Sequence, residues 1–253
     1  MAATPKGAHQ PGTFLSLYGG VGHAAAFMRR RGYCTCEVDT CINSANSLGE
    51  PQTDWEAEEL AEAADVVGLE IVCASWSLSR RAPVWSPLPH RLRRKGRFLM
   101  GLPNLPLRDR VILKRANRQV RSAVIIVKSS ILHGKSGFLE QPDTSIMWHY
   151  LYKALSQELR NRKAFIKRCC MCGYGAAWKK PTRLLVWGER AESITLKWCH
   201  GKGTCDFSGK PHHPLTSTST VMVKDHQFGT VKAQVYPKPF VSDLLSQLFR
   251  KLS

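Results

Sequence analysis

The sequence predicts an α/β fold, a doubly wound Rossmann-like sheet with a small Cys/His-bearing appendage near the C-terminus. Three observations support this fold class. Short apolar runs alternate with helical patterns, a glycine-rich turn joins the first strand to the first helix, and reactive side chains follow two later strands. At 253 residues, the chain is long enough for one large domain with a sizeable core.

The first strand and helix are predicted over residues 13–17 and 24–31, separated by the turn YGGVGH. Glycines lack a Cβ atom, so their backbone can approach a ligand closely. A plain tight turn is the alternative interpretation. The three glycines are Gly19, Gly20 and Gly22.

The second strand is predicted over residues 33–38 and ends in Asp39. An acidic residue at the tip of this strand is where nucleotide-binding folds hold ribose hydroxyls. A polar loop then leads to an acidic helix over residues 54–64, with Asp54 as its predicted N-cap.

Two further strands are predicted to bring reactive side chains to one edge of the sheet. Residues 66–72 are nearly all apolar and lead to Cys73, and residues 136–139 lead to Glu140. Ligands bind at the carboxyl edge of open α/β sheets, where both side chains would lie. A buried structural cysteine is the alternative for Cys73. An acid in the position of Glu140 is costly unless it is hydrogen-bonded or takes part in chemistry.

Two amphipathic helices complete the expected fold. The first covers residues 108–131 and has an apolar inner face and a basic outer face, and the second covers residues 241–252 near the C-terminus.

The net charge of +18, from 37 Lys and Arg against 19 Asp and Glu, indicates a polyanionic partner, with nucleic acid as the leading candidate. A solvated basic surface without a partner is the alternative. Tryptophans among the arginines after Cys73 suit stacking on bases and contact with phosphates. The candidate nucleic-acid-binding residues are Ser75, Trp76, Ser77, Arg80, Arg81, Arg91, Arg93, Arg94, Arg97, Lys179, Lys180 and Arg183.

The nine cysteines are odd in number and lack a short secreted framework, so we expect reduced thiols. Four Cys and His side chains near the C-terminus could form a tetrahedral zinc site. Their spacing is irregular, and isolated thiols beside surface histidines are the alternative. The candidate ligands are Cys172, Cys199, Cys205 and His212.

No apolar run reaches the ~18 residues that a membrane span needs, and the N-terminus has no signal-peptide layout. We therefore expect no membrane partner and a soluble protein in a reducing intracellular compartment, either the nucleus or wherever its nucleic acid resides.

Several motifs occur in the order typical of one enzyme family. They are FLSLYGGVGH, Asp39, VCASWS and LEQP, followed by CGYGAAWKKPTR and AQVYP. In this order they resemble the motifs of S-adenosylmethionine-dependent cytosine-5 DNA methyltransferases, most closely a divergent branch seen in viral, phage and mobile-element sequences. The resemblance covers nearly the whole chain.

The resemblance implies a methyltransferase fold with S-adenosylmethionine as cofactor and DNA as substrate, and the same residues would permit RNA. Cys73 would add to carbon 6 of cytosine, and Glu140 would contact ring nitrogen 3. The base would leave the stack to reach the pocket. The residues that would bind the cofactor are Phe14, Leu17, Tyr18, Gly19, Gly20, Gly22, Asp39 and Asp54.

Three positions depart from the family pattern. Ser16 replaces an acid, Val72 replaces the proline before the nucleophile, and Gln141 replaces an asparagine. These departures leave a second hypothesis open, a degenerate methyltransferase fold that binds DNA or RNA without chemistry.

The resemblance also suggests how the chain is organised. We expect a flexible N-terminus over residues 1–12 and a methyltransferase-like core over residues 13–168. A small Cys/His-bearing region would cover residues 169–232, and residues 233–253 would return to the core as a closing motif and helix.

Overall fold

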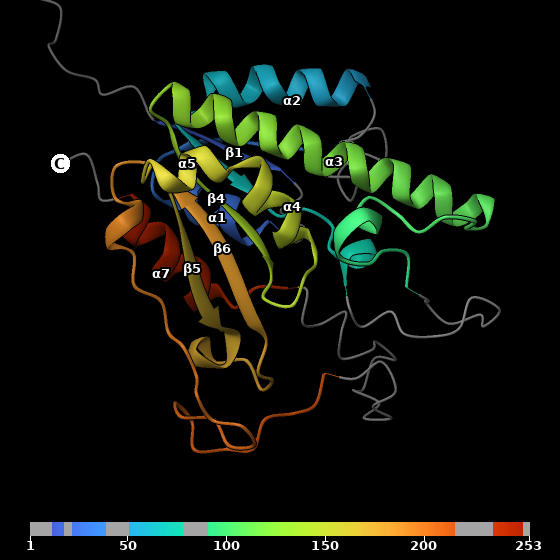
Figure 1. Cartoon of the computed structure of the whole chain (residues 1–253). Coiled ribbons are helices and arrows are strands. Elements are labelled where there is room, and N and C mark those ends of the chain that lie inside the picture. The colour runs from blue at the N-terminus through green and yellow to red at the C-terminus, as the bar shows by residue number, and fades with distance from the viewer. Residues whose placement is uncertain (1–11, 18–21, 39–50, 78–90, 216–234, 250–253) are drawn as a thin grey trace, which may run out of the picture.

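The structure is a computed structural model that describes residues 12–17, 22–38, 51–77, 91–215 and 235–249, with side chains of the first acidic helix from residue 55 onward. These residues form three layers, with a central sheet between two sets of helices (Figure 1). No helix in these ranges is both long and apolar enough to cross a membrane.

The sheet has six strands in the order β2-β1-β3-β4-β6-β5. The first four are parallel to one another, whereas β6 is antiparallel to both β4 and β5. The doubly wound α/β fold predicted from the sequence is thereby confirmed. The strands are β1 (Thr13–Leu17), β2 (Cys34–Val38), β3 (Val66–Leu69), β4 (Ser136–Pro142), β5 (Ala164–Cys170) and β6 (Pro181–Trp187).

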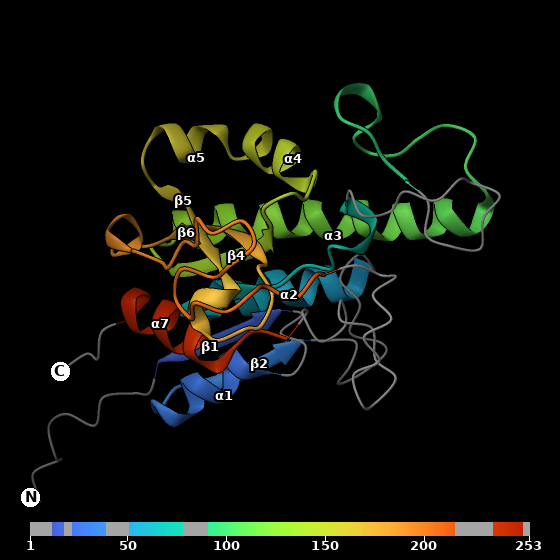
Figure 2. The ribbon, with the colours of Figure 1, turned by 90° about the horizontal axis from the view of Figure 1, so that it is seen from below.

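Helices cover both faces of the sheet, as Figures 1 and 2 show from two directions. One face is covered by α1 (His23–Arg30) and α7 (Lys238–Leu248). The other is covered by α2 (Pro51–Ala63), α3 (Leu107–Leu132), α4 (Met147–Ala154) and α5 (Ser156–Arg160). The N-terminal half of α3 extends past the sheet (Figure 1). Short 3-10 helices are η1 (Ala74–Trp76), η2 (Gly96–Phe98), η3 (Met171–Tyr174) and η4 (Ala191–Ser193).

Alternation along each strand divides the core between the two faces. In β1, Phe14 packs with α1 and α7, whereas its neighbour Leu15 packs with α2 and α3. Strand β6 follows the same rule, because Leu184 lies on the α7 side and Trp187 on the α3 side. All four side chains are almost completely buried, so apolar burial on both faces stabilises the sheet.

Most predicted elements are present, but some boundaries differ. Helix α2 begins at Pro51, so Asp54 lies within the helix and is not its N-cap. Strand β3 ends at Leu69 instead of residue 72. Strand β4 continues to Pro142, because β6 pairs with it over that length, so Glu140 lies inside the strand and not at its end. The closing helix runs from Lys238 to Leu248 instead of over residues 241–252.

The antiparallel strand β6 lies between β4 and β5 in the sheet. The boundary expected at residue 168 falls within β5, and the Cys/His region expected from residue 169 contains β6. The sheet therefore includes residues that the sequence-based division places outside the core.

Candidate functional site

Cys73 and Glu140 come from neighbouring parallel strands. Cys73 lies in the loop after β3 and caps η1, and Glu140 is buried in β4. Burial raises the pKa of the Cys73 thiol, the negative charge of Glu140 raises it further, and the charge of Lys180 lowers it. The two predicted reactive groups are therefore near enough to influence each other electrostatically.

Glu140 has two partners that come from later parts of the chain. The hydroxyl of Tyr236 donates a 2.6 Å hydrogen bond to Glu140 Oε2. Lys180 Nζ lies 3.7 Å from Glu140 Oε1, an atom that is buried and has no hydrogen-bond partner among the described residues. Burial and then the charge of Glu140 raise the pKa of Tyr236 well above its ordinary value, so this phenol remains a proton donor.

Gln141 fixes the loop that carries Cys73. Its side chain is completely buried, and Nε2 donates a 2.5 Å hydrogen bond to the carbonyl oxygen of Ile71, two residues before Cys73. Ser145 donates in turn to Gln141 Oε1 at 3.3 Å. The amide of Gln141 therefore ties the end of β4 to the loop after β3.

Arg93 and Trp76 were predicted to contact nucleic acid, but both side chains lie in the interior at 0% exposure. The guanidinium of Arg93 lies 3.5 Å from the centre of the Trp76 ring. It donates to the Leu99 carbonyl, to Asn117 Oδ1 and to the hydroxyl of Ser75, which is also buried. In this structure these three predicted residues hold the segment after Cys73 against α3 and present no surface to a ligand.

Arg183 and Lys179 also have partners within the protein. Arg183 and Arg168 both bind the carboxylate of Asp143, at distances of 2.8–3.0 Å. Burial alone would raise the pKa of Asp143, but the hydrogen bonds from the two arginines hold it below its ordinary value. Lys179 Nζ donates to the carbonyl oxygen of Gly201 at 2.7 Å.

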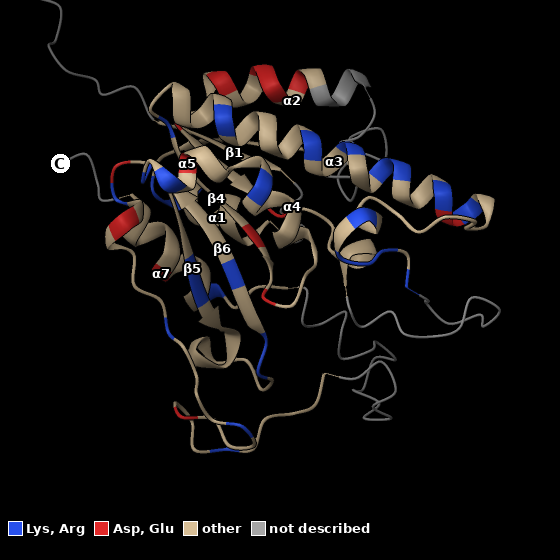
Figure 3. Ribbon diagram, viewed as in Figure 1, with Lys and Arg blue, Asp and Glu red and all other residues tan. Residues whose placement is uncertain are grey.

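Arg91, Arg94 and Arg97 are exposed, and Ser77 is half-buried. Arg80 and Arg81 lie outside the described residues. Further Lys and Arg residues recur along α3, including its projecting half (Figure 3).

The residues predicted to bind the cofactor are described only in part. Phe14 and Leu17 are buried in the core, on opposite faces of β1. Gly22 begins α1 in the left-handed conformation, with φ at 68°, and a Cβ atom there would lie 2.8 Å from Glu37 Oε2. This position therefore needs glycine. Tyr18, Gly19, Gly20 and Asp39 lie outside the described residues, and so does the side chain of Asp54.

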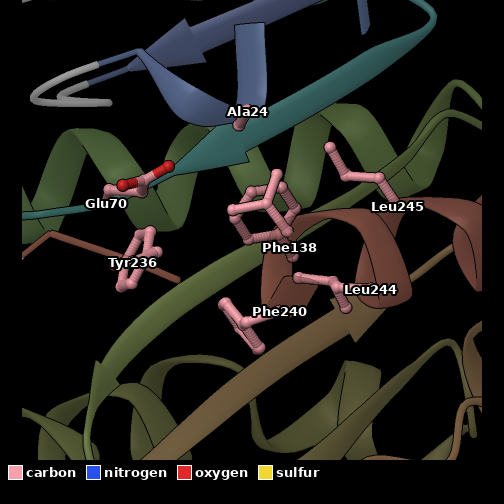
Figure 4. Close-up of a pocket in the computed structure, with 8 residues that line it drawn as sticks. Ala24, Glu70, Phe138, Tyr236, Phe240, Leu244 and Leu245 are labelled. Carbon is pink, nitrogen blue, oxygen red and sulfur yellow. The ribbon is translucent and has the colours of Figure 1, made fainter. Parts of the chain in front are cut away.

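A pocket lies beside Tyr236, between α1, β4 and α7 (Figure 4). Phe138, Phe240, Leu244 and Leu245 make most of its wall apolar, and Glu70 at the end of β3 lies at the same end as Tyr236.

The four predicted metal ligands converge. The ligand atoms of Cys172, Cys199, Cys205 and His212 all lie within 4.8 Å of one another, and the three cysteines are buried. His212 Nε2 is 3.6 Å from the sulfur of Cys199. Although burial raises the pKa of Cys205, the backbone N–H groups of Phe207 and Ser208 and the Ser208 hydroxyl lower it to about 6. These hydrogen bonds favour the thiolate form of Cys205, which metal binding requires.

Sequence reasoning missed the partners of the reactive residues. Tyr236 was noted only as part of a closing motif, and Lys180 only as a contact for nucleic acid. Their pairing with Glu140 joins residues 96 and 40 positions apart. Asp143 was not considered, although an acid directly after LEQP among so many arginines is a signal for an ion pair.

No family model and no curated protein matches the sequence. Among solved structures, the Entamoeba histolytica methyltransferase EhMeth is similar at 12% identity and a TM-score of 0.41, over 77% of this chain and 58% of that one. A mutant DNMT2 of Spodoptera frugiperda is similar at 12% identity and a TM-score of 0.40, over 79% of this chain and 57% of that one. The chain thus spans less than three fifths of the length of either structure. These likenesses are too distant to assign it a reaction.

Proposed function

We propose that the chain is an S-adenosylmethionine-dependent methyltransferase that acts on carbon 5 of cytosine in DNA through a covalent cysteine adduct. The observation that carries this proposal is that Cys73, in the loop after β3, and Glu140, in the neighbouring strand β4, are near enough to interact electrostatically, with Lys180 Nζ 3.7 Å from Glu140 Oε1. A thiol, a carboxyl and an ammonium group close to one another are suited to nucleophilic addition to a ring.

Cytosine is a poor nucleophile at carbon 5, so the reaction begins with addition of the Cys73 sulfur to carbon 6. The addition moves an electron pair toward ring nitrogen 3, and the proton of the Cys73 thiol passes to that nitrogen through Glu140 Oε1, which lacks a hydrogen-bond partner among the described residues. The methyl group that S-adenosylmethionine would supply then bonds to carbon 5, and water takes the proton from carbon 5. The carbon–sulfur bond breaks as the double bond between carbons 5 and 6 re-forms, and the sulfur regains its proton from ring nitrogen 3 through Glu140. Burial raises the pKa of Cys73, so its proton leaves in the course of attack, and the charge of Lys180 favours this step.

S-adenosylmethionine would supply the electrophilic methyl group. Gly22 fits such a cofactor, since it adopts a left-handed conformation at the start of the helix that follows the parallel strand β1. We propose that Gly22, with Gly19 and Gly20, approaches the cofactor and that Asp39 binds its ribose.

The proposed macromolecular partner is DNA. Arg110, Lys114 and Arg121 are exposed on the outer face of α3, at spacings of four and seven residues that place them on one side of the helix. Arg91 and Arg94 are exposed as well, and Lys and Arg residues recur along α3 (Figure 3). The basic stripe suits contact with successive phosphates, which would make binding fall steeply with salt concentration.

Zinc is the metal that we propose for the Cys/His cluster. Three sulfurs and one imidazole are a standard structural zinc set, and tetrahedral bonds of ordinary length place sulfur and nitrogen about 3.5 Å apart. The separation of 3.6 Å between Cys199 Sγ and His212 Nε2 fits this geometry. All the cysteines in the described residues are free thiols, and we propose that the protein works in the reducing compartment that holds its nucleic acid.

A binding module without chemistry is the second candidate function. Val72, which stands where the family has proline, is half exposed, and Ser16, which replaces an acid, is buried in β1. These changes weaken the loop and cofactor contacts that the resemblance implies, but they leave Cys73 and Glu140 in place.

Covalent trapping tests the proposal. The protein is incubated with S-adenosylmethionine and a DNA duplex that contains 5-fluorocytosine, in which fluorine replaces the proton that must leave carbon 5. We expect a denaturant-resistant adduct that is lost in Cys73→Ala and kept in Cys34→Ala, a matched control at an exposed cysteine. Salt-sensitive DNA binding without an adduct would favour the binding module. An adduct with 5-fluorocytosine RNA alone would move the proposal to RNA.

A further inference from the structure

The segment from residue 194 to residue 215 contains no helix and no strand, only an isolated bridge between Thr204 and Pro211. A run of this length without regular structure needs another source of order inside a domain. Three of the four Cys/His cluster residues, Cys199, Cys205 and His212, lie within it, and the fourth, Cys172, lies on η3 beside the sheet. The cluster therefore joins this segment to the end of β5.

The same segment is hydrogen-bonded to residues 177–180, which lead into β6. The N–H of His213 donates to the carbonyl of Ala177 at 2.9 Å, and Lys179 Nζ donates to the carbonyl of Gly201 at 2.7 Å. From η3, the N–H of Met171 donates to the carbonyl of Lys180 at 3.1 Å.

Each of these three contacts comes from a residue within two positions of a metal-ligand candidate. His213 follows His212, Met171 precedes Cys172, and Gly201 is two residues after Cys199. Gly201 is itself fixed, because its N–H and that of His200 donate to Asp206, the residue after Cys205.

Lys180 connects these contacts to the candidate active site. Its ammonium group lies 3.7 Å from Glu140 Oε1, and its side chain is only 15% exposed. It also lies 5.3 Å from the centre of the Tyr236 ring. Displacement of residues 177–180 would remove Lys180, the cationic partner that the described residues provide for the buried Glu140 carboxylate.

We propose that one zinc ion bound by Cys172, Cys199, Cys205 and His212 orders residues 177–180 and thereby positions Lys180 against Glu140. This inference rests on the zinc that we propose for the cluster, and it gives that metal a role in the site instead of in stability alone. Binding of a structural metal is coupled to folding of the segment that supplies its ligands, so loss of the ion releases that segment. Lys180 is thus a positioning residue whose placement depends on the metal.

The test compares three variants of the full chain. Cys205→Ser removes a ligand. Cys170→Ser is the matched control, because Cys170 is a buried cysteine that packs against the three cysteine ligands but is not a ligand itself. His212→Cys should keep a four-ligand zinc site, with sulfur in place of nitrogen as the fourth ligand. Metal content is measured by mass spectrometry of protein purified from zinc-supplemented cells. We expect one zinc per chain in the wild type, in Cys170→Ser and in His212→Cys, and none in Cys205→Ser.

The positioning is measured by acetylation of Lys180 with an N-hydroxysuccinimide ester, followed by peptide mass spectrometry. We expect labelling of Lys180 to rise about fivefold or more in Cys205→Ser and to stay at the wild-type level in the other two variants. Exposed Lys114 is the internal reference, and amide exchange in β4 reports that the sheet remains folded.

Three results would overturn the proposal. Zinc that persists in Cys205→Ser would overturn the ligand set. Zinc loss with unchanged labelling of Lys180 would refute the coupling while leaving a metal site. Equal exposure of Lys180 in Cys170→Ser would show general destabilisation instead. None of these measurements requires methyl transfer, so they are independent of whether the chain is an active methyltransferase.

Discussion

The phenol of Tyr236 donates to Glu140 across a separation of 96 residues, at 2.6 Å and in a buried setting. A buried carboxylate that loses a donor retains its desolvation cost without the bond that offsets it. We therefore predict that Tyr236→Phe lowers the free energy of unfolding by about 1–3 kcal/mol. Urea denaturation measures the change. Tyr152→Phe is the control, because Tyr152 is partly exposed, and an equal loss in both variants would contradict the role of the Glu140 contact.

We expect the hydrogen bond from Gln141 to the Ile71 carbonyl to limit how often a reagent in solution reaches Cys73. In Gln141→Met, the shape of the side chain is nearly kept but the buried Ile71 carbonyl loses its donor. We expect a loss of about 1–3 kcal/mol in the free energy of unfolding and faster alkylation of Cys73 by iodoacetamide, because the loop opens more often. Alkylation is followed on the Cys73 peptide. An unchanged rate would show that the loop is held by other contacts.

The buried position of Arg93 leads us to expect a large loss of stability from the conservative substitution Arg93→Lys. Its guanidinium is fully buried, and burial lowers its pKa to about 9, which still leaves it charged at neutral pH. We expect Arg93→Lys to cost about 3 kcal/mol or more of unfolding free energy, because an ammonium group cannot reproduce the planar contacts with Trp76 and Asn117.

The matched control for Arg93 is Arg94→Lys, a change at an exposed position that should stay within about 0.5 kcal/mol. Thermal and urea denaturation at neutral pH compare the two variants. Equal stability would contradict a structural role for Arg93.

Asp143 predicts a pH-dependent contribution to stability. Its folded pKa lies below the ordinary value, so the unfolded chain binds its proton more readily than the native chain does. Its contribution is therefore fully present above about pH 4 to 5, where the unfolded group is ionised, and is lost as pH falls through the lower folded pKa. We expect Asp143→Asn to be less stable than the wild type at pH 7, with the gap closing below about pH 4. Melting temperatures between pH 7 and pH 2.5 measure this, and a constant gap would exclude the linkage.

Local patterns were sufficient to predict the four parallel strands and the helices α1, α2, α3 and α7, but not the antiparallel strands β5 and β6 or the helices α4 and α5. The apolar residues of β1 and β3 alternate or run continuously as buried parallel strands do, and the residues after β3 and within β4 carry Cys73 and Glu140. The metal-ligand candidates could be selected because Cys and His are rare enough for a cluster of them to stand out.

The features that the sequence did not predict depend on contacts between residues that are distant in the chain. Arg93 was read as a surface residue because it lies in a basic run, yet it is buried by acceptors on Ser75, Leu99 and Asn117. The extension of β4 past Leu139 is likewise invisible locally, since it follows from pairing with a strand 40 residues later. Burial of a charged side chain requires partners that sequence spacing alone does not reveal.

The antiparallel insertion of β6 has a consequence for synthesis on the ribosome. Strand β5 is made before β6 but pairs with no other strand, so it has no place in the sheet until β6 follows. The edge of β4 that pairs with β6 therefore stays open in the nascent chain. It can be paired only after residue 187, the last residue of β6, has emerged from the ribosome. At ordinary elongation rates this delay lasts on the order of seconds, longer than a small helix needs to form. During that interval the unpaired edge of β4 is open to pairing with another chain.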